Sequence, residues 1–231
     1  MRIIGLTTCV GYADRLEKGL TLWRDGLNEL VVVTSPEDST TRMICGRDSV
    51  TTRTTAAFKR DGACFNKAAA LNEGLFLLLH DNGYSEAISW LLLFDADVVP
   101  PEGWRDIAGH QILIRGHRPY YIYGASRVDE QGIRIPDGDQ IGGYFQLFNL
   151  ADPRWLAEPT FGSWMTASAY DSALMLRWPP ENRVTLPLTL VHHGPVATHW
   201  LGPGTGVADV QALQARRQAE GPGSWKKERL R

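Results

Sequence analysis

The stretch Trp90-Leu91-Leu92-Leu93-Phe94-Asp95-Ala96-Asp97 decides the fold class of this chain. Five apolar residues that lead directly into two acids predict a buried parallel strand with carboxylates at its carboxyl end. That end of an open α/β sheet is where ligands bind. Because side chains at i and i+2 of an extended segment point the same way, Asp95 and Asp97 are expected to lie together and to need a cation between them. A divalent metal that holds a diphosphate would meet this need, whereas the alternative is a turn with two solvated acids.

The segments before this strand complete an α/β pattern. Strands are predicted over residues 2–8 and 29–34, with an amphipathic helix over 13–28 between them, and a second helix over 66–82 leads into the strand that ends at Asp95. Such a β-α-β start implies a parallel pair with a right-handed crossover. The first hundred residues therefore predict a Rossmann-like, mainly parallel sheet flanked by helices.

The rest of the chain is expected to extend this sheet within one domain over 1–202. Further elements are predicted as a helix over 104–114, strands over 120–127, 133–136 and 142–150, a turn at 137–139, a helix over 169–178 and a strand over 184–192. Residues 39–60, rich in Thr and Arg, show no clean period and are expected to form a loop with one short strand. A tail over 203–231 follows, with one helical stretch over 207–218.

Composition describes an ordinary globular protein. The 231 residues are 43% hydrophobic with a formal net charge of −2, so no global field attracts nucleic acid or an anionic membrane. Cys9, Cys45 and Cys64 are too widely spaced for a zinc knuckle or a disulfide framework. No apolar stretch has the length of a transmembrane segment, and we expect a cytoplasmic protein with reduced thiols. From Arg216 onward the tail has six basic and two acidic residues, which is typical of a solvated segment or of a contact with phosphates or a partner.

In order and spacing, several segments resemble metal-dependent glycosyltransferases of the GT-A fold, close to the family 2 and galactosyltransferase-like groups. The resemblance covers roughly residues 2–202 and implies transfer of a sugar from a nucleotide-sugar donor, a UDP-sugar above all, to a hydroxyl acceptor with Mn²⁺ or Mg²⁺. The segments that carry it are Ile3–Thr8, Val31-Val32-Val33-Thr34 with Glu37-Asp38, Phe65–Gly74, Phe94–Asp97, Gly142–Phe148, Tyr170-Asp171-Ser172, His192-His193-Gly194-Pro195 and His199-Trp200-Leu201-Gly202.

The resemblance implies a metal site. Asp97, with Asp95 beside it, looks like the metal-binding pair that positions the donor diphosphate, although Asp95 would alternatively face the ribose or the donor sugar. His192 occupies the place of a histidine that completes the metal site, and imidazole is an acceptable ligand for manganese. Its neighbour His193 is expected to point to the opposite face. His199 stands where the family more often has Asn.

The resemblance also implies a nucleotide site. Thr7 and Thr8, at the end of the first strand, look like part of the nucleoside pocket, and Asp38 is a candidate contact for the base. Lys67 and Asn72 occupy the helix that touches the nucleotide or its phosphates in the family. Lys67, in the first turn of that helix, is the better phosphate candidate, and an exposed helix lysine is the alternative.

Asp171 looks like the catalytic base. An inverting transfer needs a carboxylate that takes the proton of the acceptor hydroxyl as its oxygen attacks the anomeric carbon. The alternative is an acid at a helix N-terminus that satisfies the helix dipole, since Asp171 is expected to open its helix. Gly142-Gly143 allows a close backbone approach on the sugar or acceptor side. Trp164, Tyr144 and Trp200 are candidates to face a sugar, with core packing as the alternative.

The acceptor and the function class stay open at this stage. A glycan, a small molecule, a protein side chain or a hydroxymethylated DNA base are all candidate acceptors, and the small size resembles phage-type glycosyltransferases that act in a host cytoplasm. One rival is a metal-dependent hydrolase that uses an Asp95, Asp97 and His192 cluster. The other is a non-catalytic module that binds nucleotide sugars on the same fold.

Overall fold

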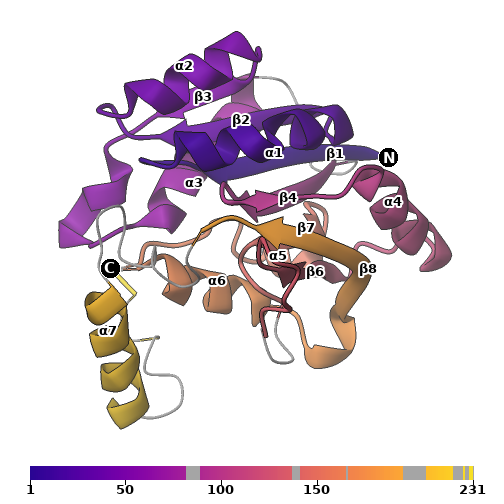
Figure 1. Ribbon diagram of the computed structural model, residues 1–231. Helices are drawn as coiled ribbons and strands as arrows, with labels where there is room; N and C mark the ends of the chain where they lie inside the picture. The colour runs from indigo at the N-terminus through magenta and orange to yellow at the C-terminus, as the bar shows by residue number, and fades with distance from the viewer. Residues whose placement is uncertain are drawn as a thin grey trace.

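The chain forms one mixed β-sheet with helices on both faces (Figure 1). The computed structural model describes residues 1–81, 89–136, 141–164, 166–194, 207–220, 226 and 229–230. In these residues the sheet has eight strands in the order β3-β2-β1-β4-β7-β6-β8-β5. Their bounds are β1 (Arg2–Thr8), β2 (Glu29–Thr34), β3 (Thr51–Thr54), β4 (Ser89–Asp95), β5 (Val98–Val99), β6 (Ile122–Val128), β7 (Phe145–Asn149) and β8 (Arg183–His192).

The parallel half of the sheet forms the edge at which a ligand is expected to bind. Strands β3, β2, β1 and β4 run parallel, so their carboxyl ends open at one edge of the sheet. Strand β7 pairs antiparallel with β4, and the short β5 pairs antiparallel with the end of β8. This last pairing brings His192 opposite Val98, next to the turn that follows β4.

Helices cover the two faces of the sheet and bury a separate core on each. Their bounds are α1 (Ala13–Gly26), α2 (Ser39–Arg47), α3 (Lys67–Phe76), α4 (Trp104–Ile114), α5 (Pro153–Leu156), α6 (Ala167–Met175) and α7 (Val207–Glu220), with 3-10 turns η1 (Ala57–Gly62) and η4 (Pro180–Asn182) and a π-helical turn η2 (Leu77–Asp81). Side chains of β1 alternate between the two cores. Ile3 packs in the cluster that contains Trp23 of α1, and Ile4 packs in the cluster that contains Leu71 of α3.

Several elements differ from the sequence-based expectation. The expected loop over 39–60 contains helix α2 besides strand β3 and turn η1, because Asp38 caps the helix and Thr41, Ile44 and Cys45 form a buried stripe. The expected strand over 133–136 makes only an isolated bridge between Val128 and Arg134. The turn expected at 137–139 lies outside the described residues.

Two further features of the described residues bear on the expectations. Cys9, Cys45 and Cys64 are free cysteines, as the spacing predicted. No helix in the part of the chain that the structure describes has the length and apolar character needed to cross a membrane.

Candidate functional site

A buried lysine joins two carboxylates at the ligand edge of the sheet. Asn66 caps helix α3, its Oδ1 accepting from the Ala69 N–H at 3.0 Å, and this places Lys67 at the first helical position. The Lys67 Nζ donates to Asp95 Oδ1 at 2.6 Å and lies 3.4 Å from Asp171 Oδ1. Burial disfavours the ammonium, but Asp171 and Asp95 outweigh it and raise the pKa of Lys67 above its usual value. Lys67 is therefore a fixed cation between two acids.

Asp171 lies in the second turn of α6, so the expectation that it opens its helix was wrong. Helix α6 begins at Ala167, with Thr166 before it, because the chain turns helical two residues earlier than the apolar pattern suggested. An acid at the helix N-terminus is thus not the role of Asp171. Burial raises the pKa of its carboxyl to about 6, Lys67 opposes this rise and Asp95 adds to it. A carboxyl with such a pKa is suited to take up a proton near neutral pH.

Gly143 leaves the room in which the Asp171 carboxylate lies. A Cβ atom at position 143 would be 2.0 Å from Asp171 Cγ and 2.2 Å from its Oδ2, distances that no real side chain tolerates. At the neighbouring position, a Cβ on Gly142 would be 2.1 Å from the Tyr144 ring. The close approach predicted for Gly142-Gly143 is therefore made by the backbone against Asp171 and Tyr144.

Asp97 pairs with His192 rather than with Asp95. Strand β4 ends at Asp95, and Ala96-Asp97 forms a turn into β5, so the extended geometry expected for the two acids stops at Asp95. The Asp97 Oδ2 lies 3.4 Å from His192 Nε2. Both side chains are largely buried. The reason is topological, because β5 pairs with the end of β8 and brings the turn against His192.

The Asp97–His192 pair fits a divalent metal as two of its ligands. A carboxylate and an imidazole are both suitable for manganese. The Nδ1 of His192 is buried and has no hydrogen-bond partner among the described residues. In that part of the chain no group of three or more His, Cys, Asp or Glu side chains is arranged to hold a metal, and Asp95 is directed toward Lys67 instead.

The two adjacent histidines face different surroundings, as the alternation of a strand predicted. The His193 Nδ1 lies 2.5 Å from Glu130 Oε1 and 3.1 Å from Lys18 Nζ. Its backbone N–H donates to the Asp97 carbonyl at 2.7 Å, which anchors the turn. His199 and Trp200 lie outside the described residues.

The nucleoside candidates differ in how their side chains are used. The Thr7 hydroxyl is buried and donates to the Phe94 carbonyl at 2.6 Å, inside the sheet. Thr8 is in register with Asp95 at the ligand edge and is partly exposed. Asp38 caps α2 through the Thr41 N–H at 3.0 Å and also accepts from the Gly11 N–H at 2.7 Å. Asp38 thus ties the loop after β1 to the start of α2.

Asn72 holds the loop between α5 and α6. Its Oδ1 accepts from the Phe161 N–H at 2.8 Å and from the Thr160 hydroxyl at 3.0 Å, and its Nδ2 donates to the Gly162 carbonyl at 3.0 Å. These hydrogen bonds account for the side chain without a nucleotide. Tyr144 and Trp164 are buried in the two cores, which is the alternative that the sequence left open for them.

Sequence reasoning missed two residues that shape the site. Asn66 had a recognisable signal, an Asn directly before an Ala-rich helical run, and it also accepts from the Trp164 N–H at 3.1 Å. Arg127 of β6 had no such local signal. Its guanidinium lies 4.2 Å from the centre of the Tyr144 ring, and its charge opposes the rise that burial causes in the pKa of Asp171.

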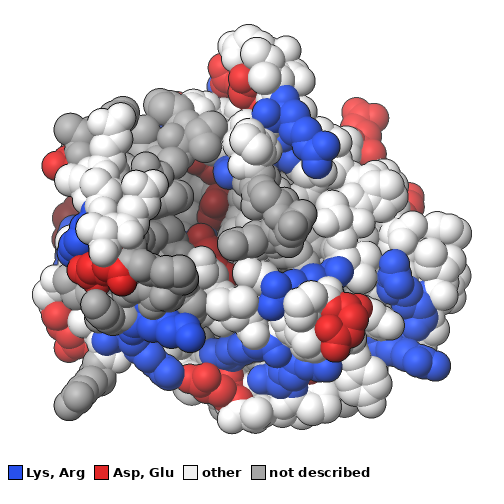
Figure 2. Space-filling view, turned by 90° about the horizontal axis from the view of Figure 1, so that it is seen from below, with Lys and Arg blue, Asp and Glu red and all other residues white. Residues whose placement is uncertain are grey.

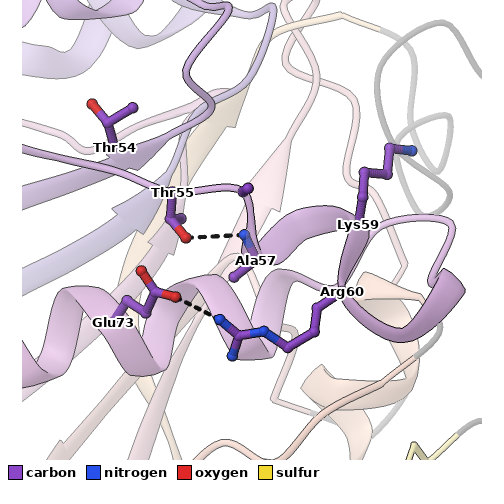
Figure 3. A pocket seen from close by; sticks show the side chains of 7 residues that line it. Thr54, Thr55, Ala57, Lys59, Arg60 and Glu73 are labelled. Atoms are coloured by element: carbon purple, nitrogen blue, oxygen red, sulfur yellow. Dashed lines mark hydrogen bonds and ion pairs between the residues drawn. The ribbon is translucent and has the colours of Figure 1, made fainter.

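Figures 2 and 3 each show a hollowed part of the surface. Figure 2 shows acidic side chains deep inside a hollow of the face drawn there. A pocket of about 440 Å³ lies at the end of β3, between η1 and α3 (Figure 3). Its polar groups bond one another or nearby backbone, since Arg60 donates to Glu73 at 2.7 Å and Lys59 donates to the Cys64 carbonyl at 2.5 Å. We assign no ligand to this second pocket.

Comparison with solved structures identifies the fold. The glucosyl-3-phosphoglycerate synthase of Mycobacterium tuberculosis, in complex with Mn²⁺, UDP-glucose and phosphoglyceric acid, matches 84% of this chain and 72% of its own at 12% identity and a TM-score of 0.54. The mannosyl-3-phosphoglycerate synthase of Rubrobacter xylanophilus matches 97% of this chain and 77% of its own at 9% identity and a TM-score of 0.53. No protein-family model and no curated protein sequence matches the chain. The structural likeness shows that the chain has the GT-A fold of such glycosyltransferases, as its sequence predicted.

Proposed function

We propose that this chain transfers a sugar from a UDP-sugar to an acceptor hydroxyl, with inversion at the anomeric carbon and with a divalent metal. The observation that carries the proposal is the arrangement of Asp95, Lys67 and Asp171 at the carboxyl edge of the parallel strands. It places a donor-side acid at the end of β4 near a half-buried carboxylate that is suited to accept a proton. The fold supports it, because glycosyltransferases with this fold include one solved with Mn²⁺ and UDP-glucose.

Asp97 and His192 are the residues that would hold the metal, which supplies positive charge to the leaving diphosphate. Thr8, which is in register with Asp95, and Lys67, which donates to Asp95, are the proposed donor contacts. Asp171 would remove the proton of the acceptor hydroxyl while the hydroxyl oxygen forms a bond to the anomeric carbon and the bond from that carbon to the diphosphate breaks. Gly143, which has no Cβ, leaves the room that the carboxylate of Asp171 needs in this position.

The direct test incubates the chain with a panel of sugar nucleotides, with Mn²⁺ and with EDTA, and detects nucleoside diphosphate and glycosylated product by mass spectrometry. We expect UDP release that needs the metal and increases with a suitable acceptor. The acceptor panel contains phosphoglycerate, a glycan and duplex DNA with a hydroxymethylated base. The anomeric configuration of the product, read by NMR, tests inversion, and a product that retains the configuration of the donor would contradict the assigned role of Asp171.

The same assay separates the rival functions. A metallohydrolase would cleave phosphoesters without a sugar nucleotide. A non-catalytic module would bind the sugar nucleotide and release no UDP. Among the described residues, only Asp97 and His192 of the Asp95, Asp97 and His192 cluster lie together, because Asp95 contacts Lys67.

A further inference from the structure

Gln146 is a polar side chain in the apolar middle of strand β7. It is fully buried and follows Phe145 directly. In the antiparallel pairing of β4 with β7 it lies opposite Leu93, and the two residues of such a pair share one face of the sheet. Leu93 belongs to the core that α3 and α6 cover, so the Gln146 amide points into that core. An amide in this place has lost its hydrogen bonds to water and needs partners inside the protein.

Only half of this amide finds a partner among the described residues. Its Nε2 donates to the Asp171 carbonyl at 3.3 Å, whereas its Oε1 is buried and accepts from no group in that part of the chain. Turning the amide over would set its oxygen against the Asp171 carbonyl oxygen, so the contact determines the orientation of the amide. An unpaired buried acceptor destabilises the folded state, and an apolar side chain of similar size would avoid that loss.

The hydrogen bond from Gln146 is not one that helix α6 needs in order to form. The Asp171 carbonyl lies inside α6, whose i→i+4 ladder offers it a second donor, the N–H of Met175. Loss of the Gln146 amide would therefore leave this carbonyl with a partner. What the amide adds is a fixed distance between strand β7 and the main chain of the residue proposed as the base.

Asp171 is thus held at its side chain and at its backbone. Lys67 holds the carboxylate from α3, and Gly143, just before β7, leaves the room for it. Gln146, three residues after Gly143, holds the backbone from the same segment of the chain. Because a misplacement by about 1 Å costs roughly a hundredfold in rate, a contact that fixes the backbone of the base bears directly on proton transfer.

We propose that Gln146 is a positioning residue, whose amide fixes Asp171 relative to the sheet for proton transfer and whose unpaired oxygen makes the fold less stable than an apolar residue would. The inference rests on the transferase function proposed above, with Asp171 as its base. Gln146 is fully buried and acts through the backbone of Asp171.

Gln146→Met tests the proposal on the full chain, since methionine has about the length of glutamine without its donor and acceptor. With UDP-glucose, Mn²⁺ and the best acceptor, we expect kcat to fall roughly ten- to a hundredfold while the KM for UDP-glucose stays nearly unchanged. Tm should stay the same or rise, because no unpaired oxygen remains. Leu147→Met, whose side chain lies in the core on the opposite face of β7, is the matched control and should keep the wild-type kcat.

Hydrogen exchange of the α6 amides, followed by mass spectrometry without substrates, gives a measurement that needs no activity. We expect faster exchange in α6 of Gln146→Met than in the wild type or in Leu147→Met. If the wild type releases no UDP with any sugar nucleotide, the proposed function fails, and the exchange still decides whether Gln146 holds α6.

Wild-type kcat in Gln146→Met would overturn the proposal, and so would wild-type exchange of its α6 amides. Gln146→Leu serves as a second variant if methionine packs badly at this position. A Tm that falls in both variants would also overturn the proposal, because the amide would then be an ordinary stabilising part of the core.

Discussion

At the scale of single residues, Asp171 is the side chain on which the proposed chemistry depends most. We expect Asp171→Asn to lower kcat by roughly 10²–10⁴, because the amide cannot take the acceptor proton. Donor affinity and folding should stay nearly unchanged, since the amide oxygen still accepts from Lys67. Asp106→Asn, at an exposed acid of α4, is the matched control. Turnover of Asp171→Asn at the wild-type rate, measured with UDP-glucose and the best acceptor, would reduce Asp171 to a structural role.

The pH dependence of turnover follows from the same carboxyl. Burial raises the pKa of Asp171 to about 6, so the protonated form, which cannot act as a base, predominates below that value. We expect kcat to fall as the pH drops through about 6 and to reach a plateau above it. A pH–rate profile of the wild type measures this limb, and it should vanish from the residual activity of Asp171→Asn.

Gly143 offers a steric test of the same geometry. In Gly143→Ala the new Cβ would lie 2.0 Å from Asp171 Cγ, so the carboxylate must move. Because misplacement by about 1 Å costs roughly 10²-fold in rate, we expect kcat to drop by that order with little change in donor affinity. Gly46→Ala is the matched control, as its Cβ would meet no atom within 4 Å. Equal kcat values for the two variants would show that Asp171 tolerates the displacement.

At the scale of elements, the sequence predicted those whose signal is local. Strands β1, β2 and β4 are apolar runs because they are buried on both faces. Their predicted bounds agree with the structure almost to the residue. Helix α2 was missed because its Thr-rich sequence hides a short buried stripe, although Asp38 was a recognisable cap. Strand β5 has two residues and exists through its pairing with β8, which no local pattern reports.

Helix α2 gives a prediction at this scale. Asp38→Ala removes the acceptor for the Thr41 and Gly11 N–H groups, and we expect a loss of about 1–2 kcal/mol in the free energy of unfolding. Asp38→Asn should restore most of it, since Asn is an equally good cap. Urea denaturation measures both. Wild-type stability of Asp38→Ala together with weakened donor binding would instead favour the base contact that the resemblance suggested.

At the scale of the whole molecule, the site is assembled from distant parts of the chain. Lys67 and Asp95 are 28 positions apart, and Lys67 and Asp171 are 104 apart. The resemblance selected these residues one by one, but it did not predict that a lysine bridges the two acids. Nor did it separate Asp95 from Asp97, because the turn after β4 is set by the β5–β8 pairing. Sequence patterns thus selected candidate residues, and the sheet order determines which of them lie together.

The melting temperature of the whole chain should rise when the donor site is occupied. A ligand that binds only the folded state stabilises it by about 2.7 kcal/mol at a hundred times its Kd, so UDP-glucose with Mn²⁺ should raise Tm by several degrees. We expect EDTA to remove most of this rise, and Asp97→Asn and His192→Gln to remove it as well, because they take away the two proposed metal ligands. His110→Gln, at an exposed histidine of α4, should keep the full rise. An equal rise in EDTA would mean that the donor binds without metal, and Asp97 and His192 would then be only a buried polar pair that joins the turn after β4 to the end of β8.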